Sequence, residues 1–101
     1  MAVTCTGADR DLVLTISGEV DHHGAGEIMR ALDSLVDAHL PRRLTLDLSG
    51  VTFMDSSGIA VILRAFRRVN ELGGQTAVRS VPAQAGKVLR AAGLDRIVKF
   101  E

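Results

Sequence analysis

The chain has 101 residues, 47% of them hydrophobic and 24% charged, and its formal net charge is +0, with 12 basic and 12 acidic residues. This length fits one compact domain, and this composition excludes a disordered chain. The balanced charge and the absence of Trp and Tyr exclude the basic field and the aromatic platforms typical of nucleic-acid binding, so we expect no direct nucleic-acid partner.

The sequence also indicates the compartment. Cys5 is the only cysteine, so no internal disulfide can form, and a reducing compartment is the simpler expectation. The N-terminus lacks the basic segment and apolar run of a signal peptide. No apolar stretch approaches the roughly 18–20 residues that a membrane span needs. We therefore expect a cytoplasmic protein without a membrane partner.

The first half of the chain alternates between the strand and the helix period. Residues 12–17 alternate apolar and polar side chains, which predicts a half-buried strand that ends at Gly18. Asp21 is a good N-cap, and the apolar residues after it recur at helical spacing up to Pro41, which predicts a helix. Residues 44–49 alternate again and predict a second strand.

The second half repeats this order. Apolar residues between 59 and 69 form one helical stripe, and Gly73 stands where a left-handed residue is expected to end that helix. Residues 75–79 predict a third strand, Pro82 and Gly93 bound a short helix, and residues 97–100 predict a last edge strand. Residues 1–6 are expected to pair with residues 12–17 as an antiparallel hairpin.

Strands that alternate with helices predict an α/β fold, here a single domain over residues 1–101. The sheet is expected to be mixed and mainly parallel, with four to five strands. Right-handed crossovers between neighbouring strands would place the helices chiefly on one face. The polar residues Thr45, Asp47 and Ser49 indicate that the other face is partly open to water.

Two loops are expected at one edge of this sheet, where the carboxyl ends of parallel strands meet. They contain residues 19–23 and residues 53–58. Asp55 or Ser56 is the expected N-cap of the second helix, beside unpaired first-turn N–H groups that favour an anion such as a phosphate. From the residues alone, an ordinary helix cap is the more frequent explanation of this segment.

Three segments carry a family resemblance: residues 18–23 (GEVDHH), 46–59 (LDLSGVTFMDSSGI) and 93–97 (GLDRI). In this order they resemble the anti-sigma factor antagonists of the STAS superfamily over nearly the whole chain. The MDSSG core is specific, and the DHH triplet is similar to the sporulation-type antagonists. The resemblance therefore implies a STAS-like version of the predicted fold.

The family resemblance also implies a mechanism. Its phosphate acceptor corresponds to Ser56. The unphosphorylated antagonist is expected to bind an anti-sigma factor that is also a serine kinase, which frees the sigma factor. Phosphorylation is expected to release the antagonist, and a PP2C-type phosphatase to reset it. The partner-binding residues expected here are Asp21, His22, His23, Asp55, Ser56, Ser57, Gly58 and Arg64.

We expect no enzyme activity, catalytic residue, cofactor or metal in this chain. It has no Gly-x-x-x-x-Gly-Lys-Ser/Thr motif, so ATP and Mg should be bound by the partner. Ser56 or Ser57, a histidine and Asp21 could meet as a hydrolase triad, but the Gly-x-Ser-x-Gly elbow is absent. His22 and His23 are adjacent, so they should diverge rather than share a metal.

Other interpretations remain open. The cluster Arg64, Arg67 and Arg68 could bind nucleic acid, but it fits the solvated side of an amphipathic helix better. Single STAS domains also serve in sensory complexes and in lipid-transport assemblies. Two departures from the family pattern are the end of the sequence at Glu101, where relatives often continue into a further helix, and Gly24 and Gly26 near the start of the first helix.

Overall fold

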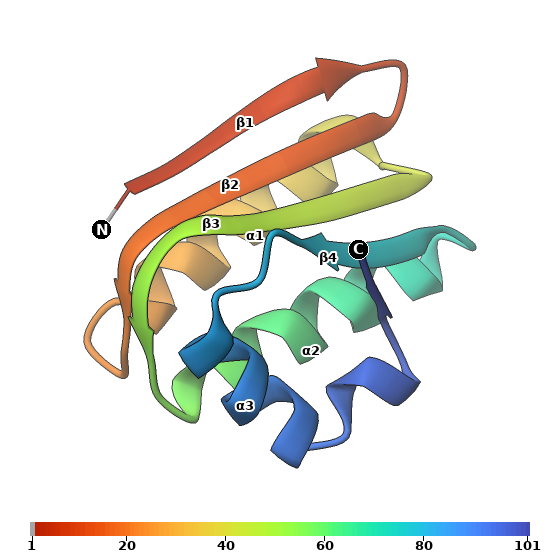
Figure 1. Cartoon of the computed structure of the whole chain (residues 1–101). Coiled ribbons are helices and arrows are strands. Elements are labelled where there is room, and N and C mark those ends of the chain that lie inside the picture. Colours follow the sequence, from red (N-terminus) through yellow and green to blue (C-terminus); the bar gives the residue numbers. More distant parts are fainter. Residues whose placement is uncertain (1) are drawn as a thin grey trace.

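The computed structural model describes residues 2–101. Its sheet has five strands in the order β1-β2-β3-β4-β5 (Figure 1). Strands β1 (Ala2–Ala8) and β2 (Asp11–Val20) are antiparallel, and β3 (Arg43–Met54), β4 (Gln75–Arg79) and β5 (Lys99–Phe100) continue the sheet in parallel. The predicted mixed, mainly parallel sheet is confirmed, including the N-terminal hairpin, although Met1 lies outside the described residues.

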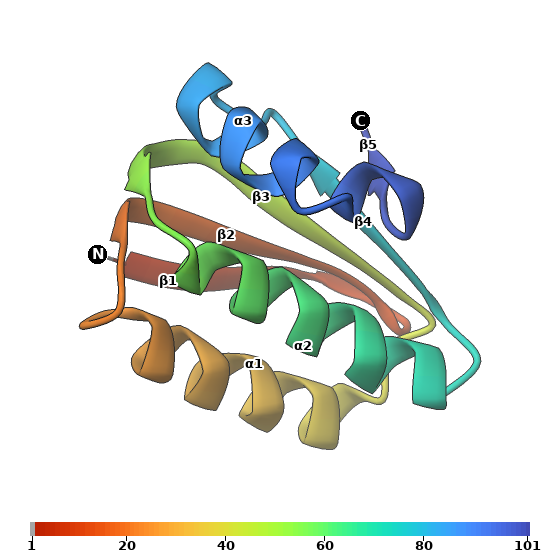
Figure 2. The ribbon, with the colours of Figure 1, turned by 90° about the horizontal axis from the view of Figure 1, so that it is seen from below.

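The helices and one face of the sheet enclose a single core. Helices α1 (Ala25–His39) and α2 (Ser57–Glu71) lie side by side below the strands in Figure 2. Helix α3 (Ala83–Ala91) and the short 3-10 helix η1 (Leu94–Arg96) follow β4. Buried side chains from all of these helices belong to one cluster with the apolar face of β2 and β3, so the helices cover one face as predicted.

The opposite face carries the polar alternate residues of the central strands. Asp47 is half-buried and accepts hydrogen bonds from the Arg79 Nε–H at 3.0 Å and the Ser49 N–H at 2.9 Å. Thr45 is buried, because its register partners Val13 and Ala77 flank it on both sides. This face is therefore partly open, as the alternation predicted.

Strand β2 is longer than predicted. It continues through Gly18, which has a φ of 87°, to Val20. Pairing with β3 persists because register shifts between Thr15 and Ser17 and between Gly18 and Glu19 accommodate the irregular backbone. Gly50 permits the close approach, since a Cβ there would lie 2.8 Å from the Ser17 Cβ. The prediction that Gly18 ends the strand was wrong, and β3 likewise runs on past Ser49 to Met54.

The start of α1 and the extent of the last strand also differ from the prediction. Helix α1 begins at Ala25 with Gly24 as its N-cap, because Asp21 is used in the turn before the helix, where its carbonyl accepts from the N–H groups of Gly24 and Ala25. The last strand shrinks to two residues, because η1 precedes it and buries Leu94 in the core.

Candidate functional site at the carboxyl end of the central strands

The ends of the two central strands bring the predicted loops together. The loop from Asp21 to Gly24 follows β2, and Asp55 and Ser56 follow β3. The Asp55 N–H donates to the Val20 carbonyl at 3.1 Å, which extends the β2–β3 pairing to the first residue of the loop. Both predicted loops therefore lie at one edge of the sheet.

The Asp55 carboxylate joins these two loops. Its Oδ1 accepts from the Ser57 N–H at 2.7 Å, and its Oδ2 accepts from the His22 N–H at 3.2 Å. Hydrogen bonding from Ser57, above all from its backbone N–H, lowers the pKa of Asp55 despite the opposing effect of desolvation, and the His22 N–H contributes less. Asp55 is consequently ionised at neutral pH and fixes the start of α2.

Ser56 occupies the N-cap position of α2, with φ −61° and ψ −16°, and is exposed. Its side chain makes no capping bond within the described residues, because the N–H groups of Gly58 and Ile59, from which an N-cap hydroxyl would accept, donate to the Asp55 and Ser56 carbonyls. The Asp55 carboxylate instead accepts from the Ser57 N–H. The sequence predicted either Asp55 or Ser56 as the N-cap of this helix. Ser56 occupies the N-cap position, and Asp55 supplies the side-chain hydrogen bond to the first turn. This division leaves the Ser56 hydroxyl accessible at the positive end of the helix.

Gly58 sets the distance between α2 and the end of β3. A Cβ on this buried glycine would lie 2.4 Å from both Cγ and Sδ of Met54, a separation that no side chain could tolerate without movement. Met54 is itself only 1% exposed. The absence of a side chain at Gly58 therefore allows the first turn of α2 to rest directly on Met54.

The two histidines lie beside this helix start. Asp21 Oδ1 accepts from the N–H groups of His23 at 3.0 Å and Gly24 at 2.9 Å, so Asp21 shapes the turn. The prediction that His22 and His23 diverge was wrong, because their exposed rings lie 3.9 Å apart at their centroids. His22 Nδ1 lies 3.9 Å from Asp55 Oδ2. In the described range no group of three or more His, Cys, Asp or Glu could hold a metal ion.

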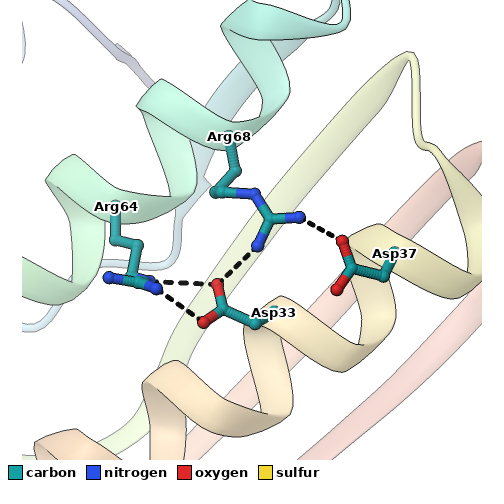
Figure 3. Close-up of polar contacts among 4 residues, drawn as sticks. All are labelled: Asp33, Asp37, Arg64 and Arg68. Atoms are coloured by element: carbon teal, nitrogen blue, oxygen red, sulfur yellow. Dashed lines mark hydrogen bonds and ion pairs between the residues drawn. The ribbon is translucent and has the colours of Figure 1, made fainter.

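Arg64 lies about two turns along α2 from Ser56 and is engaged with α1 (Figure 3). Its Nε and Nη2 donate to the two Asp33 oxygens at 3.0 and 2.7 Å. Arg68 bridges Asp33, at 2.8 Å, and Asp37. The structure therefore places the predicted partner residue Arg64 in an interhelical ion-pair cluster, apart from the two loops.

Sequence reasoning missed two neighbours of the site. Phe53 precedes Met54 and keeps 46% of its surface exposed, an unusual position for a large apolar side chain. Gln84 in α3 forms two hydrogen bonds with the backbone of Met54, at 2.8 and 2.7 Å. Phe53 and Met54 are both apolar, so the sequence did not indicate which of them is exposed, and nothing local in the sequence connected Gln84 to Met54, 30 positions earlier.

Within residues 2–101, no helix is long and apolar enough to cross a membrane.

Fold and site define a small α/β domain that presents an exposed serine at the start of a firmly held helix. A family model described as the STAS domain matches residues 2–101, and the chain belongs to this family. An "Anti-sigma F factor antagonist" from Paenibacillus polymyxa is 33% identical over 87 residues, which span 86% of this chain and 74% of the relative.

Solved structures show the same fold. The anti-sigma factor antagonist SpoIIAA in its unphosphorylated form superposes with a TM-score of 0.84 at 23% identity, covering 99% of this chain and 88% of that one. The Bacillus cell fate determinant SpoIIAA in the phosphorylated form gives a TM-score of 0.75 at 23% identity, covering 99% and 91%. These likenesses confirm the STAS-like architecture expected from the sequence.

Proposed function

We propose that this STAS domain is an anti-sigma factor antagonist that is switched by phosphate on Ser56. Unphosphorylated, it binds an anti-sigma factor that is also a serine kinase, and the sigma factor is freed. Phosphorylation of Ser56 blocks this binding. The similarity to an anti-sigma F factor antagonist supports the role, and the exposed Ser56 hydroxyl at the N-cap of α2 is the observation that carries the switch.

The choice of Ser56 over Ser57 rests on exposure. Ser56 is exposed, whereas Ser57 is half-buried and its N–H is held by Asp55 at 2.7 Å. A kinase must bring its bound ATP in line with the attacking hydroxyl, so an accessible serine on a fixed backbone is the better acceptor. Ser56 meets both conditions.

The partner surface proposed for this switch surrounds Ser56. It comprises Asp21, His22, His23, Asp55 and Ser57, with Arg64 farther along α2, whereas Gly58, also predicted to bind the partner, is buried and supports this surface from beneath. Phosphorylation would add about −1.5 to −2 charges beside the Asp55 carboxylate. Burying that charge in a fitted interface costs desolvation and repels acidic neighbours, so the partner is released. Arg64 can contact the partner fully only by giving up part of its pairing with Asp33.

In this proposal the transfer and the removal of the phosphate are catalysed by partner proteins. The kinase binds ATP and Mg, a PP2C-type phosphatase removes the phosphate, and residues 1–101 act in the cytoplasm as one binding domain without enzyme activity. The sequence around Ser56 and Ser57 supports the last point, since it lacks the Gly-x-Ser-x-Gly elbow of serine hydrolases.

The test is phosphorylation by a candidate anti-sigma factor kinase that is first captured from extract by the unphosphorylated chain. With Mg-ATP, intact mass should rise by one phosphate, and peptide mapping should place it on Ser56. The Ser56→Ala variant should gain none, whereas the Ser57→Ala variant should still be modified. Phosphate on Ser57 alone, or none with a kinase that binds the chain, would contradict the proposal.

A further inference from the structure

Gln84 binds both backbone polar groups of Met54. Its Oε1 accepts from the Met54 N–H at 2.8 Å, and its Nε2 donates to the Met54 carbonyl at 2.7 Å. Gln84 lies in the first turn of α3, far along the chain from β3. A primary amide carries one acceptor and two donors, so it can pair with a peptide backbone in the way that a neighbouring strand does.

The sheet explains why Met54 needs such a partner. Pairing between β3 and β4 runs from Arg43 to Asp47, where β4 ends opposite at Arg79, but β3 continues to Met54. The Asp55 N–H points toward β2, where it donates to Val20. Because backbone groups of successive residues in a strand point to opposite sides, those of Met54 face the side that β4 has left. Gln84 substitutes there for the missing strand.

Met54 connects Gln84 to the segment that holds Ser56. Met54 is buried, so its N–H and carbonyl would be costly to leave unpaired. Its side chain lies under Gly58, and its backbone continues into Asp55, whose carboxylate binds the N–H groups of Ser57 and His22. A displaced Met54 would therefore displace the cap of α2 and the loop that follows β2.

We propose that Gln84 is a positioning residue for the phosphate acceptor: by clamping the backbone of Met54, it fixes Ser56 in the geometry that the kinase requires. The role of Ser56 as acceptor rests on the proposed function above. The clamp itself does not, because it concerns the geometry of residues 54–57 in the free protein. These two parts can be tested separately.

The decisive variants are Gln84→Met and Gln84→Ala. Gln84→Met keeps the length of the side chain but removes both hydrogen bonds, whereas Gln84→Ala also removes its volume. Lys87→Ala is the matched control, since Lys87 is an exposed long side chain one turn farther along α3. All measurements are made at a temperature at which thermal melts show every variant to be folded.

Amide hydrogen exchange of the free protein tests the clamp. In Gln84→Met, exchange at the N–H groups of Met54 and Ser57 should accelerate at least about tenfold, while that of Leu46 in the centre of the sheet should stay within about twofold of wild type. Lys87→Ala should change none of them. Unchanged exchange at Met54 and Ser57 would overturn the proposal.

Phosphorylation kinetics test the consequence. With the kinase and Mg-ATP, Gln84→Met and Gln84→Ala should lose at least about tenfold in kcat/KM for Ser56, mainly in kcat, because a misplaced acceptor reacts slowly even when it is bound. Rates within about twofold of wild type would overturn the positioning role. If wild type itself is not phosphorylated, the proposed function fails, and hydrogen exchange alone decides whether Gln84 is a clamp.

Discussion

At the scale of single residues, the site depends on a division of labour between Asp55 and Ser56. Serine at an N-cap ordinarily accepts a first-turn N–H with its own hydroxyl. Here Asp55 accepts the Ser57 N–H at 2.7 Å, and Ser56 makes no such bond to any described residue. The backbone of the acceptor is thus fixed by its neighbour, and its hydroxyl stays free for chemistry.

Gly58 is predicted to be intolerant of a side chain. Gly58→Ala would place a Cβ 2.4 Å from Met54, so we expect a loss of about 1–3 kcal/mol from the free energy of unfolding through overpacking. Chemical denaturation measures this loss. Gly26→Ala is the control: its Cβ would lie 3.5 Å from the flexible end of Arg30, so it should stabilise α1 by about 0.5–1 kcal/mol. Equal effects of the two substitutions would contradict the close contact between Gly58 and Met54.

At the scale of secondary-structure elements, Asp33 links α1 to α2. It accepts two hydrogen bonds from Arg64 and one from Arg68, and its side chain is 27% exposed. Hydrogen bonding from Arg64, more than any other factor, lowers the pKa of Asp33. The folded state therefore favours the ionised carboxylate more strongly than the unfolded state does.

The lowered pKa of Asp33 makes the stability of the fold depend on pH. Because the folded pKa is lowered, the stabilisation by Asp33 is present above its unfolded pKa of about 3.9 and is lost as the pH falls through the folded pKa. Asp33→Asn should therefore lower the Tm by a few degrees at about pH 7, and this deficit should shrink progressively as the pH falls below about 4. Thermal melts across this range measure it.

Glu71→Gln controls for removal of a carboxylate from α2, since Glu71 is exposed and has no ion pair in the described part of the chain. Its effect on the Tm should be small at every pH. A Tm difference for Asp33→Asn that persisted undiminished at low pH would show that packing, rather than the ion pairs, causes it.

The order of the helices and strands could be predicted from the periodicity of apolar residues, but several of their boundaries could not. Period-2 alternation in residues 12–17 and 44–49 identified β2 and β3, yet both strands run farther, because bulges near Gly18 and the close approach at Gly50 keep them paired where the alternation fails. Helix α2 was the best predicted helix, with Gly73 in the expected left-handed conformation after it.

The candidate site was predictable where it is local in the chain. The sequence placed the loops of Asp21 and Asp55 at one edge, because carboxyl ends of parallel strands converge there. The exchange of capping roles between Asp55 and Ser56 depends on side-chain rotamers, and the Gln84 clamp depends on where β4 ends relative to β3. Neither is encoded in local periodicity. The functional roles of all these residues remain predictions.

At the scale of the whole molecule, phosphate on Ser56 should leave the fold intact. A phosphate at a helix N-terminus is favourable by typically 0.3–1 kcal/mol when exposed, whereas the adjacent Asp55 opposes it. Both effects are small beside the roughly 5–15 kcal/mol that stabilises a domain. The core that holds α2 in place lies beneath the helix and contains buried residues such as Val61, Ile62 and Val69, whereas Ser56 is exposed.

We therefore expect the phosphorylated and unphosphorylated forms to have nearly identical far-UV circular dichroism and Tm values within a few degrees of each other. Thermal melts of the two purified forms measure this. A phosphorylated form that melts far lower, or that loses helical signal, would mean that the switch operates by unfolding rather than at the surface around Ser56.

The affinity of the anti-sigma factor kinase for the two forms tests the central claim most directly. Isothermal titration with the unphosphorylated chain, the chain phosphorylated on Ser56 and the Ser56→Ala variant compares them under one condition. The phosphorylated form should bind at least about tenfold more weakly, equivalent to about 1.4 kcal/mol, while Ser56→Ala should bind like the unphosphorylated chain. Equal affinity of the phosphorylated and unphosphorylated forms would contradict the switch.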